Sequence, residues 1–107
     1  MKVIREGHRY ELANFEGKAL PGQTLQFIEK IPSGEPNAEP GALVTLFDGT
    51  TNEEVLAVLI DRCQSLYNKF PSEETKGAIE DMKAALYKLE TRTRNRQARG
   101  VEGKALS

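Results

Sequence analysis

Two stretches in the second half of the chain repeat apolar residues at steps of three and four. The first consists of Leu56, Leu59, Ile60, Cys63, Leu66 and Tyr67, and the second of Ala78, Ile79, Met82, Ala85, Leu86 and Leu89. This period is typical of an amphipathic helix that buries one face. Phe70-Pro71 separates the stretches, because the residue before a proline is disfavoured in the α conformation. The pattern predicts an antiparallel helical hairpin over residues 50–100.

Local signals mark both ends of each predicted helix. Thr50 or Thr51 can cap the first helix, and Ser72 can cap the second, each followed by glutamates that favour a helix start. Gly100 suits the position after the last helical turn. Val55 and Val58 add a second apolar strip to the first helix. We expect the β portion or a neighbouring subunit to cover that strip.

Residues 1–49 have a different pattern. Tyr10 and Leu12 alternate with polar residues, QTLQFIEKI does so more clearly, and ALVTLF is rich in apolar and β-branched residues. Residues 32–41 contain three prolines and two glycines and predict a flexible loop. We therefore expect an α+β fold: a small N-terminal antiparallel β-sheet of two or three strands, followed by a long antiparallel αα-hairpin. The 107 residues fit a single domain, with a tail at 101–107.

The residue composition and the absence of known motifs argue against several classes of function. The single histidine (His8) and single cysteine (Cys63) cannot form a cysteine–histidine metal site, and neither a phosphate-binding loop nor a dinucleotide fingerprint is present. Carboxylate pairs such as Glu73-Glu74 lie at helix starts or on polar faces, whereas a catalytic acid–base pair needs burial or a charged partner. We expect neither an enzyme nor a cofactor. Without a signal peptide or a bilayer-spanning stretch, the sequence predicts a soluble intracellular protein with no membrane partner.

Charge is uneven along the chain. The net charge is −1, but residues 88–104 hold six basic and two acidic residues. Arg92, Arg96 and Arg99 share one helix face, which continues the packing stripe past Leu89. Arginines on an inward face are costly unless an anion meets them.

Three interpretations of the arginine cluster stay open on the residues alone. The first is a solvated basic helix end, and the second is a weak nucleic-acid contact through phosphates. The third is a pocket for a phosphorylated nucleotide, in which Phe70, Tyr67 or Tyr87 stacks on a base. Phe70 lies at the opposite end of the hairpin from the arginines. A pocket that combines them therefore requires an antiparallel neighbour, which predicts a site between subunits. An oligomeric interaction protein without a ligand is the alternative from another class.

Longer motifs carry a resemblance. DGTTNEEVLAVLIDR, NKFP and LETRTRNRQARGVEG resemble the helical hairpin shared by two phage immune-evasion families, Thoeris anti-defence protein 1 and anti-CBASS protein 2. YELANFEGKALPGQTLQFIEK and LVTLFDGTTNEEV are similar to the β portion of the former, so that the resemblance spans nearly the whole chain. Proteins of this kind are sponges: they bind cyclic signalling nucleotides of bacterial defence systems without degrading them and so keep the effector inactive.

The resemblance implies a ligand, an assembly and a site. The ligand would be a cyclic ADP-ribose isomer made by a TIR-domain enzyme in the host bacterial cytoplasm, with a cyclic oligonucleotide at a separate site in some members. The assembly would be a homodimer, with hexamers as trimers of dimers. Phe70 would stack on adenine; Arg92, Arg96 and Arg99 would hold the pyrophosphate or a second nucleotide; and Thr51 and Asn52 would either contact ligand or cap the helix. No nucleic-acid polymer is expected as a partner.

One segment departs from the family pattern. The family commonly reads FPCRENA at the hairpin turn, whereas this chain reads Phe70-Pro71-Ser72-Glu73-Glu74-Thr75. The missing arginine and the added acid would change the choice of ligand or weaken a phosphate contact.

Overall fold

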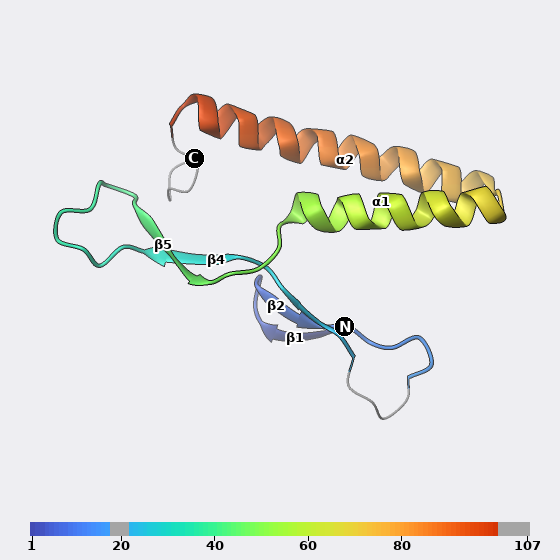
Figure 1. The fold of residues 1–107 in the computed structure, drawn as a ribbon, viewed down its shortest axis with the longest axis horizontal. Coiled ribbons are helices and arrows are strands. Elements are labelled where there is room, and N and C mark those ends of the chain that lie inside the picture. Colours follow the sequence, from blue (N-terminus) through green and yellow to red (C-terminus); the bar gives the residue numbers. More distant parts are fainter. Residues whose placement is uncertain (18–21, 101–107) are drawn as a thin grey trace. The chain divides into compact units, whose positions relative to one another are not determined.

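The computed structural model describes residues 1–17 and 22–100; the predicted tail at 101–107 lies outside the described residues. The described elements are β1 (Lys2–Arg5), β2 (Arg9–Glu11), β3 (Thr24–Gln26), β4 (Glu29–Pro32), β5 (Leu43–Phe47), α1 (Asn52–Lys69) and α2 (Glu73–Ala98) (Figure 1). The α+β class predicted from the sequence is confirmed. The chain divides into two compact units, Met1–Thr51 (the β unit) and Asn52–Ser107 (the hairpin unit). Neither described helix is long and apolar enough to cross a bilayer.

The β unit contains two small antiparallel sheets among its described residues, where the sequence predicted one. β1, β2 and β3 form the first sheet in that order, and β4 pairs with β5 in the second. QTLQFIEKI, which alternates like one strand, is divided between them: Leu25 pairs with Tyr10 in the first sheet, and Ile31 pairs with Val44 in the second. The alternation of apolar and polar residues predicts strand in both parts of this segment, but it does not reveal that the chain passes from one sheet to the other between them.

The change of sheet occurs at Phe27 and Ile28, where the backbone bonds to two distant segments. The Phe27 amide donates to the His8 carbonyl at 2.7 Å, and the Ile28 amide donates to the Thr50 carbonyl at 2.9 Å. The Thr50 amide in turn donates to the Gln26 carbonyl at 2.9 Å. Gly49 lies so close to this strand that an added Cβ would be 2.4 Å from the Gln26 carbonyl oxygen. Glycine is therefore required there by close backbone approach.

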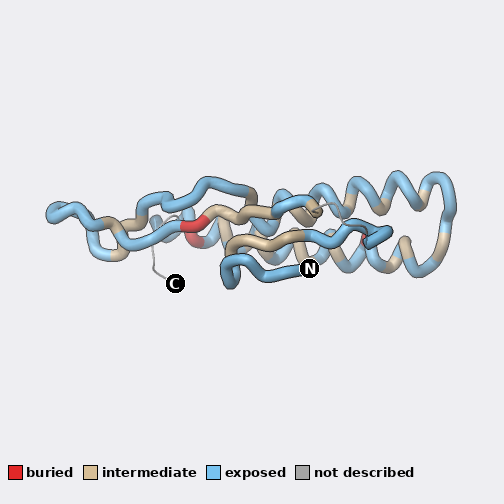
Figure 2. The backbone as a smooth tube through the Cα atoms, turned by 90° about the horizontal axis from the view of Figure 1, so that it is seen from below, coloured by how far each residue is buried: buried red, intermediate tan, exposed pale blue. Residues whose placement is uncertain are grey.

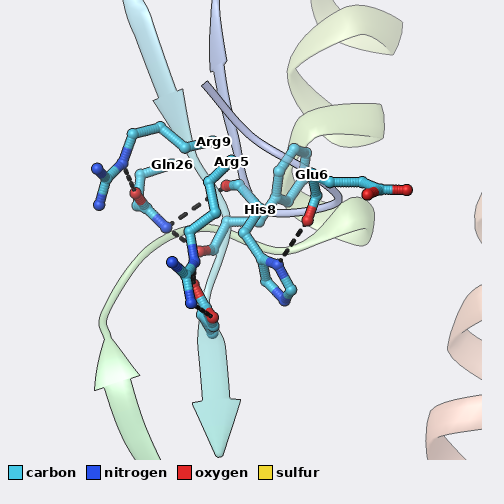
Figure 3. A network of polar contacts seen from close by, with 7 residues as sticks. Arg5, Glu6, His8, Arg9 and Gln26 are labelled. Carbon is cyan, nitrogen blue, oxygen red and sulfur yellow. Dashed lines mark hydrogen bonds and ion pairs between the residues drawn. The ribbon is translucent and has the colours of Figure 1, made fainter. Parts of the chain in front are cut away.

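Polar side chains join the two sheets of the β unit. Arg5 on β1 makes a two-pronged ion pair with Glu29 on β4, at 2.6 Å and 2.7 Å, and Glu29 is 5% exposed. The hydrogen bonds from Arg5 hold the pKa of the Glu29 carboxyl below its ordinary value against the opposing effect of burial. Arg9 on β2 bonds to Gln26 and lies 4.8 Å from the ring centroid of Phe47 on β5. Figure 3 shows this network from close by.

The hairpin unit follows the predicted pattern closely. α1 begins at Asn52, directly after the predicted cap residue, and α2 begins at Glu73. The two helices lie side by side (Figure 1). Figure 2 shows that most of the described backbone belongs to exposed or half-buried residues. The facing stripes are mostly half-buried, and among the described residues Ile79 is the one hydrophobic side chain that is buried. Cys63, predicted to be buried, is half-buried. A hairpin that buries so little leaves much of its apolar surface uncovered.

Candidate functional site

The turn of the hairpin presents Phe70 to solvent on a well-defined backbone. The Phe70 amide donates to the Leu66 carbonyl at 2.8 Å and so continues the bonding of α1 for one residue. Ser72 then caps α2: its extended backbone turns the chain, and its hydroxyl accepts from the Thr75 amide at 3.1 Å. Phe70 is 77% exposed between these two fixed points. An exposed aromatic ring on a rigid turn suits stacking on a flat ligand, because little conformational entropy is lost on binding.

Tyr67 is half-buried beside the turn and lines a groove of about 220 Å³ between the helices. Two lysines, Lys76 and Lys83, line the same groove together with Gln64, Ile79 and Glu80. The groove therefore combines an aromatic edge with two cationic side chains. Lys76 and Lys83 belong to no motif in the sequence, and only their spacing of seven residues, which places them on one face of α2, could have indicated a shared role.

The arginine cluster differs from the prediction. Arg96 is buried, at 8% exposed, whereas Arg92 and Arg99 are exposed, so the expectation that all three lie on a covered face is wrong. α2 has 26 residues and α1 has 18, so at about 1.5 Å per residue α2 is longer by about 12 Å. Arg92 precedes Arg96 on α2 and lies nearer the turn, so the difference in helix length does not explain why Arg96 alone of the three is buried. The spacing of the arginines does not give the burial of each.

Arg94, which is not among the predicted site residues, belongs to a cluster of contacting side chains on α2. Its guanidinium lies 5.9 Å from the ring centroid of Tyr87 and donates to the Thr91 hydroxyl at 3.0 Å. Thr91 in turn donates to the Tyr87 carbonyl at 2.8 Å. Arg94 also lines a shallow pocket of about 320 Å³ with Glu53 of α1 and with Glu90 and Thr93. In the sequence, this cluster is indicated only by the spacing of seven residues between Tyr87 and Arg94, which places both on one face of α2.

Thr51 and Asn52 are both exposed at the start of α1. Glu53 and Glu54 follow in its first turn, where the helix dipole favours negative charge. The same two acids make this helix end a poor site for a phosphate unless cations from elsewhere offset them. No set of three or more His, Cys, Asp or Glu side chains within residues 1–17 and 22–100 could hold a metal ion.

The predicted site residues therefore form two separate groups. Phe70 and Tyr67 lie at the turn, whereas Arg92, Arg96, Arg99, Thr51 and Asn52 lie at the other end of the helices. From the start of α2 to Arg96 the distance along the helix is about 35 Å at about 1.5 Å per residue. One hairpin cannot bring Phe70 and the arginines to the same small ligand.

Comparison of this chain with protein-family models, curated proteins and solved structures found no match.

Proposed function

We propose that this protein binds a cyclic signalling nucleotide and releases it chemically unaltered, acting as a sponge at sites formed between two copies of the chain. The cyclic ADP-ribose isomers of TIR-domain enzymes are the leading ligand class, with cyclic oligonucleotides second. The observation that carries the proposal is the 77% exposure of Phe70 on its capped turn, at the far end of the helices from a group of arginines. The motifs that resemble the anti-defence families name the ligand class.

The chemistry of the two groups complements that of a nucleotide. A base has a flat π-face that stacks on an aromatic ring, a contact worth about 1–3 kcal/mol for each base. A pyrophosphate accepts paired hydrogen bonds from the planar guanidinium of arginine. Arg92 and Arg99 are exposed and can reach a ligand without rearrangement of the helix. Binding through stacking and ion pairing requires no bond to break, which suits capture without turnover.

A capture experiment tests the proposal directly. The protein is incubated with the product of a TIR-domain enzyme and filtered to remove free nucleotide, and the retained fraction is heated to denature the protein. We expect the filtrate to be depleted of nucleotide and the heated fraction to return it with unchanged mass. Nucleotide that stays in the first filtrate contradicts the proposal. A degraded nucleotide in the heated fraction indicates an enzyme instead.

Phe70→Ala tests the role assigned to the turn, with Phe15→Ala as the matched control. Phe15 is fully exposed in the β unit and has no part in the proposed site. The loss of one stacking contact of about 1–3 kcal/mol weakens affinity by about fivefold to 150-fold. We therefore expect that weakening for Phe70→Ala and unchanged affinity for Phe15→Ala, measured by isothermal titration calorimetry. Equal affinity in the two variants would remove Phe70 from the site.

A ligand-free interaction protein is the second candidate, and the exposed apolar side chains of the hairpin unit favour it. Leu59 is 43% exposed, Val58 is 59% exposed and Tyr87 is 66% exposed. Arg92→Ala and Arg99→Ala separate the two candidates, because both arginines are exposed and their loss leaves the helix intact. The sponge predicts weaker nucleotide binding with unchanged assembly; the interaction protein predicts weaker assembly. Duplex DNA binding that falls steeply with salt would indicate the nucleic-acid alternative.

A further inference from the structure

The groove between the helices beside the turn, which we call the turn groove, combines apolar and polar lining residues. The most buried of them are Ile79, at 6% exposed, and the half-buried Tyr67. The other lining residues are exposed and polar: Gln64 from α1, and Lys76, Glu80 and Lys83 from α2. An apolar lining with a few polar groups around it is typical of a small-molecule site.

The α2 side of the turn groove carries two cations and one anion. Lys76, Glu80 and Lys83 follow one another at steps of four and three, so they share one face of the helix. Within residues 1–17 and 22–100, neither lysine forms an ion pair with Glu80 or with another carboxylate. The lining therefore carries a net charge of +1, two lysines against one glutamate, and both ammonium groups are available to an anion.

The turn groove also offers hydrogen-bond acceptors. Nε2 of Gln64 donates to Oδ1 of Asn68 at 2.9 Å, which holds the side chain and leaves its carbonyl oxygen to accept. An ionised Glu80 carboxylate only accepts hydrogen bonds, and it repels a simple anion. A ligand that has hydroxyl groups as well as negative charge can instead donate to Glu80. Carboxylates bind ribose hydroxyls in this way in dinucleotide sites.

The size of the turn groove limits what it can hold. Its volume of about 220 Å³ is below the roughly 300–1,000 Å³ of a site for a drug-sized ligand, so it takes a fragment rather than a whole nucleotide. A pentose ring is compact, and its C–H groups can pack against Tyr67 and Ile79. A sugar that carries one phosphate therefore matches the groove in size, in charge and in hydroxyl donors.

We propose that the turn groove binds a ribose phosphate. The phosphate binds the ammonium groups of Lys76 and Lys83. The ribose hydroxyls donate to Gln64 and Glu80. Each polar residue that lines the groove then has a partner on the ligand, including the glutamate that a bare phosphate would leave unfavourably placed.

This assignment rests on the proposed function in so far as the ribose phosphate belongs to the captured nucleotide. Tyr67 lies three residues before Phe70, or about 4.5 Å along the helix at about 1.5 Å per residue. A base that stacks on Phe70 can therefore stay attached to a ribose in the turn groove. One hairpin then contacts the base, the sugar and one phosphate, and the arginines of a second copy meet the remaining phosphate.

NMR titration of ¹⁵N-labelled wild-type protein tests the turn groove without a cyclic nucleotide. The probes are ribose 5-phosphate, ribose and inorganic phosphate. We expect ribose 5-phosphate to shift the amide signals of Tyr67, Ile79 and Glu80 saturably, with a dissociation constant at least fivefold lower than that of either other probe. The absence of a saturable shift, or equal affinity for inorganic phosphate, overturns the proposal.

Lys76→Gln and Lys83→Gln test the phosphate contacts. Each removes one exposed cation, and we expect each to weaken ribose 5-phosphate binding about threefold to tenfold. Lys88→Gln is the matched control, because Lys88 is an exposed α2 lysine outside the groove. Circular dichroism at 222 nm confirms that each variant is folded. A groove variant that binds ribose 5-phosphate as well as Lys88→Gln overturns the proposal.

Glu80→Gln separates a ribose phosphate site from a simple cationic patch. Removal of the negative charge strengthens the attraction of any anion, so a cationic patch predicts tighter binding of both ribose 5-phosphate and inorganic phosphate. A carboxylate that accepts from the ribose predicts opposite changes: tighter binding of inorganic phosphate and at least threefold weaker binding of ribose 5-phosphate. Tighter binding of both probes overturns the proposal.

Capture of the product of a TIR-domain enzyme is measured separately on the same variants. A wild-type protein that binds ribose 5-phosphate in the turn groove but captures no cyclic nucleotide supports the groove and rejects the sponge. If wild type captures the cyclic nucleotide and Lys76→Gln captures it as well as Lys88→Gln does, the sponge stands and the role of the turn groove in it is overturned.

Discussion

The β unit and the hairpin unit are held together by different kinds of contact. In the β unit, a buried carboxylate, an arginine bonded to it and a second arginine over an aromatic ring connect two small sheets. In the hairpin unit, the helices meet along half-buried apolar stripes, and Ile79 is the one buried hydrophobic side chain among the described residues. In the β unit, directional polar contacts determine which strands lie together. In the hairpin unit, the repeated spacing of apolar residues determines how the two helices pack.

This difference indicates which kind of contact favours further association. Apolar packing is non-directional and scales with the area covered, so a half-covered stripe favours further association. Paired polar groups that have already found their partners gain little from a new one. Both units keep apolar side chains exposed, among them Val58 and Leu59 on α1 and Val3 and Val44 in the β unit, and these are better places to expect assembly than the polar network. Four substitutions test this contrast.

Ile79→Ala is expected to have the largest effect. Removing most of a buried aliphatic side chain costs the transfer free energy of the lost atoms and leaves a cavity, about 3 kcal/mol in all. Leu59→Ala is the control, because Leu59 is 43% exposed and its truncation costs about 1 kcal/mol or less. Urea unfolding followed at 222 nm measures both. Equal losses would show that the hairpin has no dominant packing centre.

Gly49→Ala is expected to have the next largest effect and to act on the β unit. The new Cβ would be 2.4 Å from the Gln26 carbonyl oxygen and 2.7 Å from the Phe27 carbonyl carbon, so the backbone must move. The cost is about 1–3 kcal/mol. Gly34→Ala is the matched control, since its Cβ meets nothing within 4 Å. Amide hydrogen exchange at Phe27, Ile28 and Thr50 should become faster in Gly49→Ala. It should stay at the wild-type rate in Gly34→Ala.

Ser72→Ala removes the cap of α2 and is expected to cost about 1 kcal/mol. The Thr75 amide loses its acceptor, and the turn that carries Phe70 loses one of its two fixed points. Ser72→Asp supplies another acceptor and should retain most of the stability. Melting temperatures of the two variants against wild type give the comparison. A Ser72→Asp variant as unstable as Ser72→Ala would show that the cap is not the cause.

The last substitution, Glu29→Gln, keeps the shape of the side chain but cannot ionise, and it is expected to change how stability depends on pH. The pKa of Glu29 is lower in the folded protein than its ordinary value of 4.5, chiefly because Arg5 bonds to the carboxylate. Its stabilising contribution is therefore complete above pH 4.5 and is lost as the pH falls through the lower folded value. The variant should flatten this part of the pH–stability curve. Glu35→Gln, which changes an exposed loop carboxylate, should leave the curve unchanged.

The hairpin could be predicted because its signals are local. Ser72 as a cap and Gly100 with its positive φ of 70° are both confirmed, and each depends on residues within one or two turns of itself. Local spacing predicted one common face for Arg92, Arg96 and Arg99, but it could not show that Arg96 alone of the three is buried.

The β unit could be predicted only in outline. The strand segments follow from alternation, but the partners of each strand do not, because pairing in a sheet joins segments distant in sequence. Arg5 and Glu29 are 24 residues apart, and no periodicity relates them. The ion pair depends on a long-range contact that no local pattern encodes.

Native mass spectrometry of the protein with the product of a TIR-domain enzyme tests the central claim most directly, because one spectrum reports the number of chains, the number of ligands and the mass of each ligand. Capture between copies predicts a complex of at least two chains that carries the cyclic nucleotide with its mass unchanged. A single chain with bound nucleotide, a hydrolysed ligand, or an assembly that stays empty at excess nucleotide would contradict it.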